Sequence, residues 1–132
     1  MTRNNQPLLL DTHVFIWSLE QIEKLGQETQ QLLQSGASVY ISKASLWELA
    51  IKYKVKKFPY NTDSLLEGIK LSGFSLLDID TEHLQMYSAT QLPNKDPFDL
   101  LLVTQANVER YLFVTADGNI LESSYSMQDA TK

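Results

Sequence analysis

The sequence predicts an α/β fold in which helices cover a central parallel sheet of about four to five strands. Short apolar runs alternate with longer segments of helical periodicity, the pattern of parallel strands connected by helices. Two runs, Leu8–Leu10 and Tyr111–Val114, are continuously apolar, as expected for strands buried on both faces. The 132 residues suit one domain, with a core from about residue 8 to 125 and a short polar tail at each end.

The first half of the chain contains two predicted strands and four predicted helices. Leu8–Leu10 follows the polar residues Met1–Gln6 and ends at Asp11, and Ser38–Ile41 forms the second strand. Ser35-Gly36 and Ser72-Gly73 are helix stop signals. The helices are expected at Thr12–Leu19, Leu25–Gln34, Ser42–Lys54 and Asp63–Leu71.

The second half repeats the alternation. Strands are predicted at Phe74–Ile79 and Tyr111–Val114, and a loop at Leu92–Lys95. Residues Gln128–Lys132 are expected to form a loose tail. The helices are expected at Thr81–Thr90 and Asp96–Glu109.

Composition excludes several classes of protein. The absence of cysteine excludes disulfides and thiolate metal sites. No apolar run approaches the roughly 18 residues of a membrane span, and the N-terminus lacks the apolar stretch of a signal peptide, so a cytoplasmic protein is expected. A net charge of -5 argues against binding nucleic acid by bulk electrostatics. This net charge does not exclude a site that binds phosphates through metal ions, where carboxylates hold the ions.

Four acids stand out by their context. Asp11 and Asp117 follow the two continuously apolar strands, whereas Glu48 and Asp99 lie in the opening turns of apolar helices. In a parallel sheet, ligands bind beyond the carboxyl ends of the strands, so all four acids are able to converge at one edge. Crowded carboxylates repel one another and need a counter-charge, which a hard divalent cation supplies.

Each acid also has a purely structural interpretation. Glu48 follows Ser45 by three residues, the spacing of a capping box. Asp96 before Pro97 is typical of a helix N-cap, and Asp99 then favours the helix dipole. Asp11 is also a potential cap, and Asp117 before Gly118-Asn119 a potential turn residue.

Basic and aromatic residues leave similar alternatives. A patch of lysines is either a solvated helix end or a phosphate track towards the acids. His13 is interpreted as structural and His83 as exposed, whereas Trp17 and Trp47 are expected in the core. The lysines of this patch are Lys52, Lys54, Lys56 and Lys57.

Four segments occur in the order and spacing of the PIN-domain toxins. From Leu8 to Tyr125 the chain resembles a VapC-type ribonuclease of a bacterial type II toxin–antitoxin pair. The segments are Leu8-Leu9-Leu10-Asp11-Thr12-His13, Ser45-Leu46-Trp47-Glu48-Leu49-Ala50-Ile51-Lys52, Asp96-Pro97-Phe98-Asp99 and Val114-Thr115-Ala116-Asp117.

The resemblance implies a PIN-like α/β/α sandwich and Mg²⁺- or Mn²⁺-dependent endonucleolytic cleavage of RNA. Water activated by the metal attacks the phosphodiester in line. The family motifs assign metal binding and catalysis to four acids, and supporting roles to Asp96, Thr12 and Thr115. The four acids are Asp11, Glu48, Asp99 and Asp117.

The resemblance also implies a homodimer and a tight complex with a VapB-like antitoxin whose tail enters the active-site groove. The helix around Phe15, Trp17 and Leu19 is a candidate for part of these contacts. The chain departs from the family at Leu100 and Ala116, where basic residues are common, which affects RNA affinity more than metal binding. Two main alternatives stay open, a PIN-like binding module with weak or no catalysis and a nuclease that cleaves DNA. A purely structural interaction protein is a third.

Overall fold

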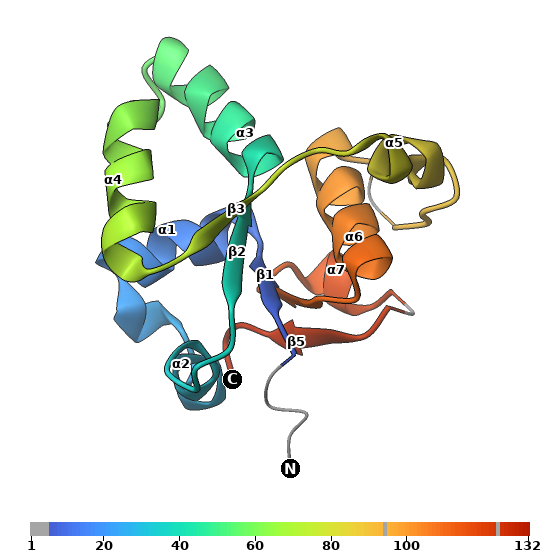
Figure 1. The fold of residues 1–132 in the computed structure, drawn as a ribbon, viewed down its shortest axis with the longest axis horizontal. Helices are drawn as coiled ribbons and strands as arrows, with labels where there is room; N and C mark the ends of the chain where they lie inside the picture. The colour runs from blue at the N-terminus through green and yellow to red at the C-terminus, as the bar shows by residue number, and fades with distance from the viewer. Residues whose placement is uncertain (1–5, 94, 124) are drawn as a thin grey trace.

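A five-stranded, fully parallel sheet forms the centre of the described residues, with strand order β3-β2-β1-β4-β5 (Figure 1). The computed structural model describes residues 6–93, 95–123 and 125–132. The first five residues of the expected polar tail, and Asn94 of the expected loop, lie outside them. The predicted α/β class is confirmed. The strands are β1 Leu8–Leu10, β2 Val39–Ser42, β3 Ser75–Leu77, β4 Leu112–Thr115 and β5 Met127–Asp129.

Helices cover both faces of the sheet. In Figure 1, α1, α3 and α4 lie on one side and α5, α6 and α7 on the other. None of the helices within the described residues is long and apolar enough to cross a membrane. The bounds are α1 Thr12–Glu20, the 3-10 helix η2 Ile22–Lys24, α2 Gln27–Leu33, α3 Lys43–Lys54, α4 Thr62–Ser72, α5 Thr81–Tyr87, α6 Pro97–Glu109 and α7 Gly118–Leu121.

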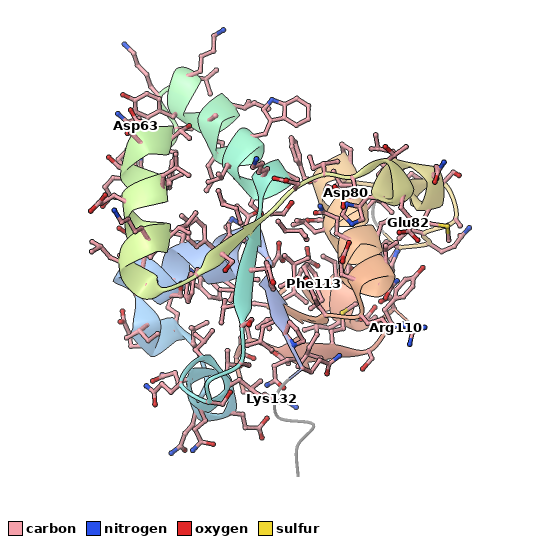
Figure 2. The ribbon with its side chains drawn as sticks, viewed as in Figure 1. Asp63, Asp80, Glu82, Arg110, Phe113 and Lys132 are labelled. Carbon is pink, nitrogen blue, oxygen red and sulfur yellow. The ribbon has the colours of Figure 1, made fainter. Side chains whose placement is uncertain are left out.

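The two faces of β1 belong to two separate hydrophobic clusters. Leu8 and Leu10 pack in the cluster that includes α1 and α4, whereas Leu9 packs in the cluster that includes α6 and α7. This division follows from the alternation of side chains along a strand. Figure 2 shows Phe113 of β4 in the second cluster, while Arg110 at the end of α6 lies at the periphery. Burial on both faces explains why β1 and β4 have no polar residue before their last position.

The C-terminal segment was predicted as a loose tail, and this prediction is wrong. Residues Met127–Asp129 form β5, which pairs in parallel with β4. Ala130 is completely buried, and the Glu28 N–H donates to the backbone oxygen of Lys132 at 2.7 Å. Because β5 is an edge strand, it pairs on one side only and stays partly exposed, so this polar segment does not need the apolar pattern of β1.

Two predictions about individual side chains are also wrong. Trp47 is 61% exposed rather than in the core, and His83 is completely buried rather than exposed. The expected capping box of Ser45 and Glu48 is absent from α3, since the N-cap is Ser42, whose Oγ accepts from the Ala44 N–H at 3.0 Å. Glu48 is therefore not used to cap its own helix.

Candidate active site

The candidate site lies where the carboxyl ends of β1 and β4 meet. The chain leaves β1 towards β2 on one side of the sheet, and β4 adds on the other side, so the strand order reverses between them. Ligand sites of open parallel sheets form at such switch points. Asp11 directly follows β1, and its N–H donates to the Val114 carbonyl of β4 at 2.9 Å. Asp117 lies two residues beyond the end of β4.

All four acids singled out in the sequence line one hollow of about 350 Å³ at this edge. Glu48 enters it from the second turn of α3, and Asp99 from the first turn of α6. The hollow thus combines side chains from four elements that are far apart in the sequence. Its lining residues are Asp11, Thr12, His13, Trp17, Glu48, Lys52, Asp96, Asp99, Ala116 and Asp117.

The Asp11 carboxylate is held by two donors. The Thr115 hydroxyl donates to Oδ2 at 2.6 Å, and the Thr12 N–H donates to Oδ1 at 2.8 Å. Thr115 also accepts from the Asp117 N–H at 3.1 Å, so one buried hydroxyl orients both segments that carry acids. Asp11 therefore caps α1, as predicted, and also lines the hollow.

Glu48 is oriented by a chain of two hydroxyls. The Thr12 hydroxyl donates to Glu48 Oε1 at 2.8 Å, and the Ser45 hydroxyl lies 2.8 Å from Thr12 Oγ1. Because Thr12 has a single hydroxyl proton, Ser45 donates to Thr12. Ser45 is completely buried and was missed as a supporting residue. The signal for it was the spacing of three residues to Glu48, which places both on one helix face.

Asp96 caps α6 as its alternative interpretation predicted, whereas Asp117, which was interpreted as a turn residue, caps the short helix α7. Asp96 Oδ1 accepts from the Phe98 N–H at 2.8 Å, and Asp117 Oδ1 accepts from the Asn119 N–H at 2.9 Å. These caps fix the two carboxyl groups at the rim of the hollow. Capping and membership of the acid cluster are therefore compatible in this fold.

The electrostatics of the hollow are those of crowded carboxylates. Burial, followed by the negative charges of the neighbouring acids, raises the pKa of Asp99 to about 7. Burial also raises the pKa of Asp11, although the hydrogen bonds from Thr115 and Thr12 oppose that shift. The acids that act on Asp99 are Asp11, Asp96, Asp117 and Glu48, in decreasing order.

This donor set fits a hard divalent cation. The five carboxylates of the hollow offer oxygen ligands, which Mg²⁺ and Mn²⁺ prefer, and a cation would relieve the repulsion that raises the Asp99 pKa. Asp11, Glu48, Asp99 and Asp117 are the residues that would hold it. Mg²⁺ usually keeps several water ligands and takes only a few from the protein, so the carboxylates do not all have to touch it.

A second group of potential metal ligands lies at the other end of α6. Asp80, His83 and Glu109 bring one ligand atom each within 4.8 Å of one another, the one such group among the described residues. The Asp80 N–H donates to His83 Nδ1 at 3.0 Å, so His83 Nε2 carries the proton and donates to Glu109 Oε2 at 2.8 Å. Both ring nitrogens are used, and we name this group the histidine junction.

The predicted lysine patch is divided by the structure. Lys52 is half-buried and lines the hollow with the acids. Lys54, Lys56 and Lys57 are exposed and line a different depression, together with Phe58. Position in the sequence thus does not decide which lysine reaches the acids.

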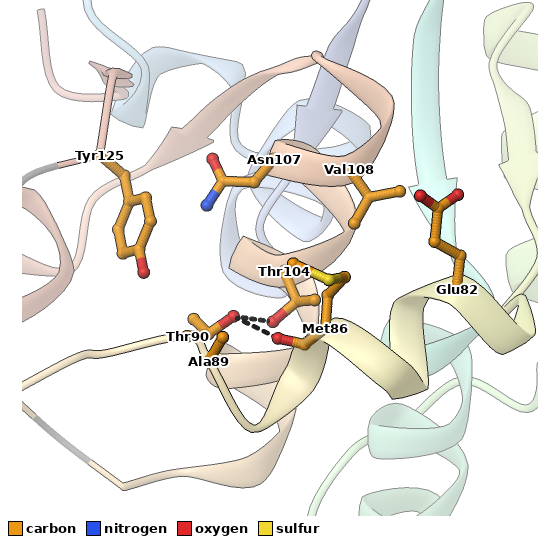
Figure 3. Close-up of a pocket in the computed structure, with 8 residues that line it drawn as sticks. All are labelled: Glu82, Met86, Ala89, Thr90, Thr104, Asn107, Val108 and Tyr125. Carbon is orange, nitrogen blue, oxygen red and sulfur yellow. Dashed lines mark hydrogen bonds between the residues drawn. The ribbon is translucent and has the colours of Figure 1, made fainter.

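Two further depressions among the described residues have no cluster of charged side chains. The one in Figure 3 lies between α5 and α6 and contains a single carboxylate, Glu82. Its Thr90 and Thr104 hydroxyls are hydrogen-bonded to each other, and Thr104 donates to the Leu100 carbonyl at 2.7 Å. An apolar depression beside the acids is lined by Trp47, Ile51, Leu84, Tyr87, Pro97, Phe98 and Leu101, which we name the apolar shelf.

These features define an α/β domain with an acidic site at the switch point of a parallel sheet. The family model of the PIN domain matches residues 8–123. The chain therefore belongs to the PIN domain family, as the four sequence motifs predicted. No curated protein sequence is similar enough to the chain to count as a match.

Solved structures of toxin–antitoxin complexes share this fold. VapBC2 from Rickettsia felis, bound to a DNA fragment from its promoter, is 21% identical with a TM-score of 0.68, over 92% of this chain and 96% of that one. DNA-bound VapBC from Salmonella typhimurium is 18% identical with a TM-score of 0.65, over 93% and 96%. FitAcB from Neisseria gonorrhoeae is 18% identical with a TM-score of 0.62, over 92% and 96%. At these identities the likeness concerns the fold.

Proposed function

We propose that this chain is a VapC-type toxin, a Mg²⁺- or Mn²⁺-dependent endoribonuclease that a cognate VapB-like antitoxin neutralises. The observation that carries the proposal is the gathering of Asp11, Glu48, Asp99 and Asp117 in one hollow of a PIN-family chain. Members of this family are generally nucleases. The toxin–antitoxin complexes with the same fold support the role of toxin.

In this proposal the four acids hold the cation, and hydroxyl groups hold the acids. Thr115 fixes Asp11, and the Ser45–Thr12 chain fixes Glu48, so neither carboxylate has to reorganise when a cation binds. Asp96 supports the site as the cap that presents Asp99. The bound cation would supply activation of the attacking water and stabilisation of charge on the phosphate.

The basic patch of Lys52, Lys54, Lys56 and Lys57 provides the expected contact to RNA. The last three lie beside Phe58 at the end of α3, where a polyanion is able to follow them towards the hollow. Their local positive charge is able to attract a polyanion although the chain as a whole has a net charge of -5. The two departures from the family, Leu100 and Ala116, leave fewer cations next to Asp99 and Asp117.

Two surfaces suit the proposed protein partners. Phe15, expected to contribute to such a surface, is completely buried in the core instead. Ile16 and Leu19 of α1 line a depression with Leu65 of α4, where an antitoxin helix would bury its apolar face. The apolar shelf, which includes the exposed Trp47, suits a second copy of the chain.

The test is cleavage of a mixed cellular RNA pool by the purified protein with Mg²⁺ or Mn²⁺, and with EDTA. Asp11→Asn and Asp99→Asn serve as site variants, and Asp63→Asn, an exposed acid on α4, as the matched control. Discrete cleavage that disappears in EDTA and in both site variants, but persists in Asp63→Asn, supports the proposal. Antitoxin-free protein that is folded, loaded with metal and inactive on RNA contradicts it.

The same experiment distinguishes the two alternatives. A single-stranded DNA of matched sequence, cleaved faster than the RNA, would indicate a DNA nuclease. Binding of RNA without cleavage of either substrate would indicate a binding module, with Leu100 and Ala116 as the first positions to restore to basic residues.

A further inference from the structure

Lys52 differs from every other basic residue near the site. Among the described residues it is the one lysine or arginine that lines the acid hollow, where five carboxylates surround it. Its Nζ lies 3.8 Å from Glu48 Oε2, and its side chain is 39% exposed. The neighbouring lysines of the basic patch face another depression.

The distance between Lys52 and Glu48 indicates a loose ion pair. Hydrogen bonds between nitrogen and oxygen are about 2.7–3.2 Å long, and charged ones are shorter, so a separation of 3.8 Å lies beyond that range. Glu48 Oε1, in contrast, accepts from Thr12 at 2.8 Å. Glu48 is thus oriented by the hydroxyl chain, and the ammonium group is not needed to hold it in place.

A phosphodiester that enters this hollow needs positive charge from protein side chains as well as from a bound metal ion. The hollow contains carboxylates from β1, α3, α6 and the end of β4, and each RNA phosphate adds a negative charge. Positions 100 and 116, which flank the acids, are leucine and alanine. A lysine has a flexible stem of four carbons and a compact charge, so its ammonium is able to leave one anion for another nearby.

We propose that Lys52 is the residue of this site that binds a substrate phosphate, and that it exchanges Glu48 for that phosphate when RNA binds. The inference deepens the proposed function, because it rests on RNA as the substrate. Before RNA binds, Lys52 partly balances Glu48. After RNA binds, Lys52 contacts a phosphate of the strand beside the acids, and Glu48 would be balanced by a bound cation instead.

The first test is the salt dependence of RNA binding. A labelled single-stranded RNA is titrated with wild type, Lys52→Gln, Lys52→Arg and Lys70→Gln in Ca²⁺, which takes the same oxygen ligands. Lys70 is the matched control, an exposed lysine in the last turn of α4. Loss of one phosphate contact makes the slope of log K against log salt shallower by about 0.7 for a single strand. We expect this change for Lys52→Gln alone, with a several-fold loss of affinity.

The second test separates phosphate binding from support of Glu48. Without RNA, Lys52→Gln is expected to bind Mn²⁺ at least as tightly as wild type in calorimetry, because the ammonium no longer competes for Glu48. If Lys52 only positioned Glu48, affinities for Mn²⁺ and RNA would fall together, and the proposal would be overturned. An unchanged salt slope for Lys52→Gln, or no RNA binding by wild type, would also overturn it.

Failure of the proposed function has a different signature. If wild type binds RNA but does not cleave it with Mg²⁺ or Mn²⁺, the ribonuclease proposal fails, while the salt slope in Ca²⁺ still reports on Lys52.

Discussion

The two ends of α6 carry acidic clusters that balance their charge in different ways. At its start, Asp96 and Asp99 are two of the five carboxylates that line the acid hollow, together with one lysine. The pKa of Asp99 rises there to about 7. At its end, Glu109 accepts from the imidazole of His83 at 2.8 Å in the histidine junction. In the histidine junction, both nitrogens of the imidazole ring are hydrogen-bonded to groups of the protein. In the hollow, the carboxylates repel one another, and this repulsion favours binding of a cation.

The difference shows what each cluster contributes to the protein. The junction continues into the interior, where Gln105 of α6 donates to the Asp78 carbonyl at 3.1 Å and accepts from Ser42 at 2.6 Å. It therefore joins α6 to the ends of β2 and β3 and stabilises the fold. The hollow concentrates repulsion, which costs stability and favours binding of a cation. One end of α6 thus stabilises the fold, and the other end carries the acids to which the proposed function assigns cation binding.

Replacing one carboxylate by its amide in each cluster tests this division most strongly. Asp117→Asn is expected to lower RNA cleavage by a factor on the order of 10³, because several kcal/mol of charge stabilisation depend on the ligand set. Asparagine preserves the cap of α7. Glu109→Gln, measured in the same assay, is expected to retain cleavage within a few-fold. Comparable loss in both variants would contradict the separation of roles.

Removal of the buried imidazole tests the same division through stability. His83→Ala is expected to lower the free energy of unfolding by about 2–4 kcal/mol, since it leaves a cavity and unpaired polar groups. Urea denaturation measures the change. His13, which was interpreted as structural, is exposed in the structure. His13→Ala is therefore the control and is expected to change the free energy of unfolding by less than about 0.5 kcal/mol. If His83→Ala unfolds like wild type, the junction is not a stabilising element.

The pH dependence of the metal-free protein tests the repulsion in the hollow. The pKa of Asp99 is about 7 in the folded chain and near 4 when unfolded, so the folded state binds more protons between these values. Stability should therefore fall as pH rises from about 4 to 7 and remain lower above pH 7. The difference in pKa corresponds to about 4 kcal/mol, which solvent screening of this half-buried carboxyl group reduces to roughly 2–3 kcal/mol. Thermal unfolding of wild type and Asp99→Asn across this window measures the effect. A profile that is identical in both proteins would exclude Asp99 as its source.

Removal of one supporting hydroxyl is expected to have the smallest effect. Thr12→Val removes the donor to Glu48 Oε1 and should weaken Mn²⁺ binding by about 10–100-fold, as loss of supporting contacts typically does. Calorimetry measures the affinity. Thr90→Val, which changes a hydroxyl bonded to Thr104 away from the hollow, is the control. Equal affinities in the two variants would show that Glu48 needs no orientation by Thr12.

Local features of the sequence predicted much of the fold and of the acid site. Apolar runs and helical periodicity depend on neighbouring residues, so they located β1, β4 and the longer helices, but not the short η2 and α7. The acids of the hollow were also predictable, because parallel strands align their carboxyl ends and Asp11 and Asp117 follow two such strands. Segments with a weak local pattern were missed: β5 is short and polar, and it is stabilised by pairing with β4.

What the sequence by itself determined is the α/β class, the four acids and the PIN family to which the chain belongs. Only the tertiary structure separated Lys52 from the other lysines of the basic patch, buried His83 and placed Ser45 behind Thr12. These outcomes depend on contacts between distant segments, such as the Thr115–Asp11 hydrogen bond across 104 positions. Periodicity constrains which face of an element is buried, whereas packing between elements decides which side chains meet.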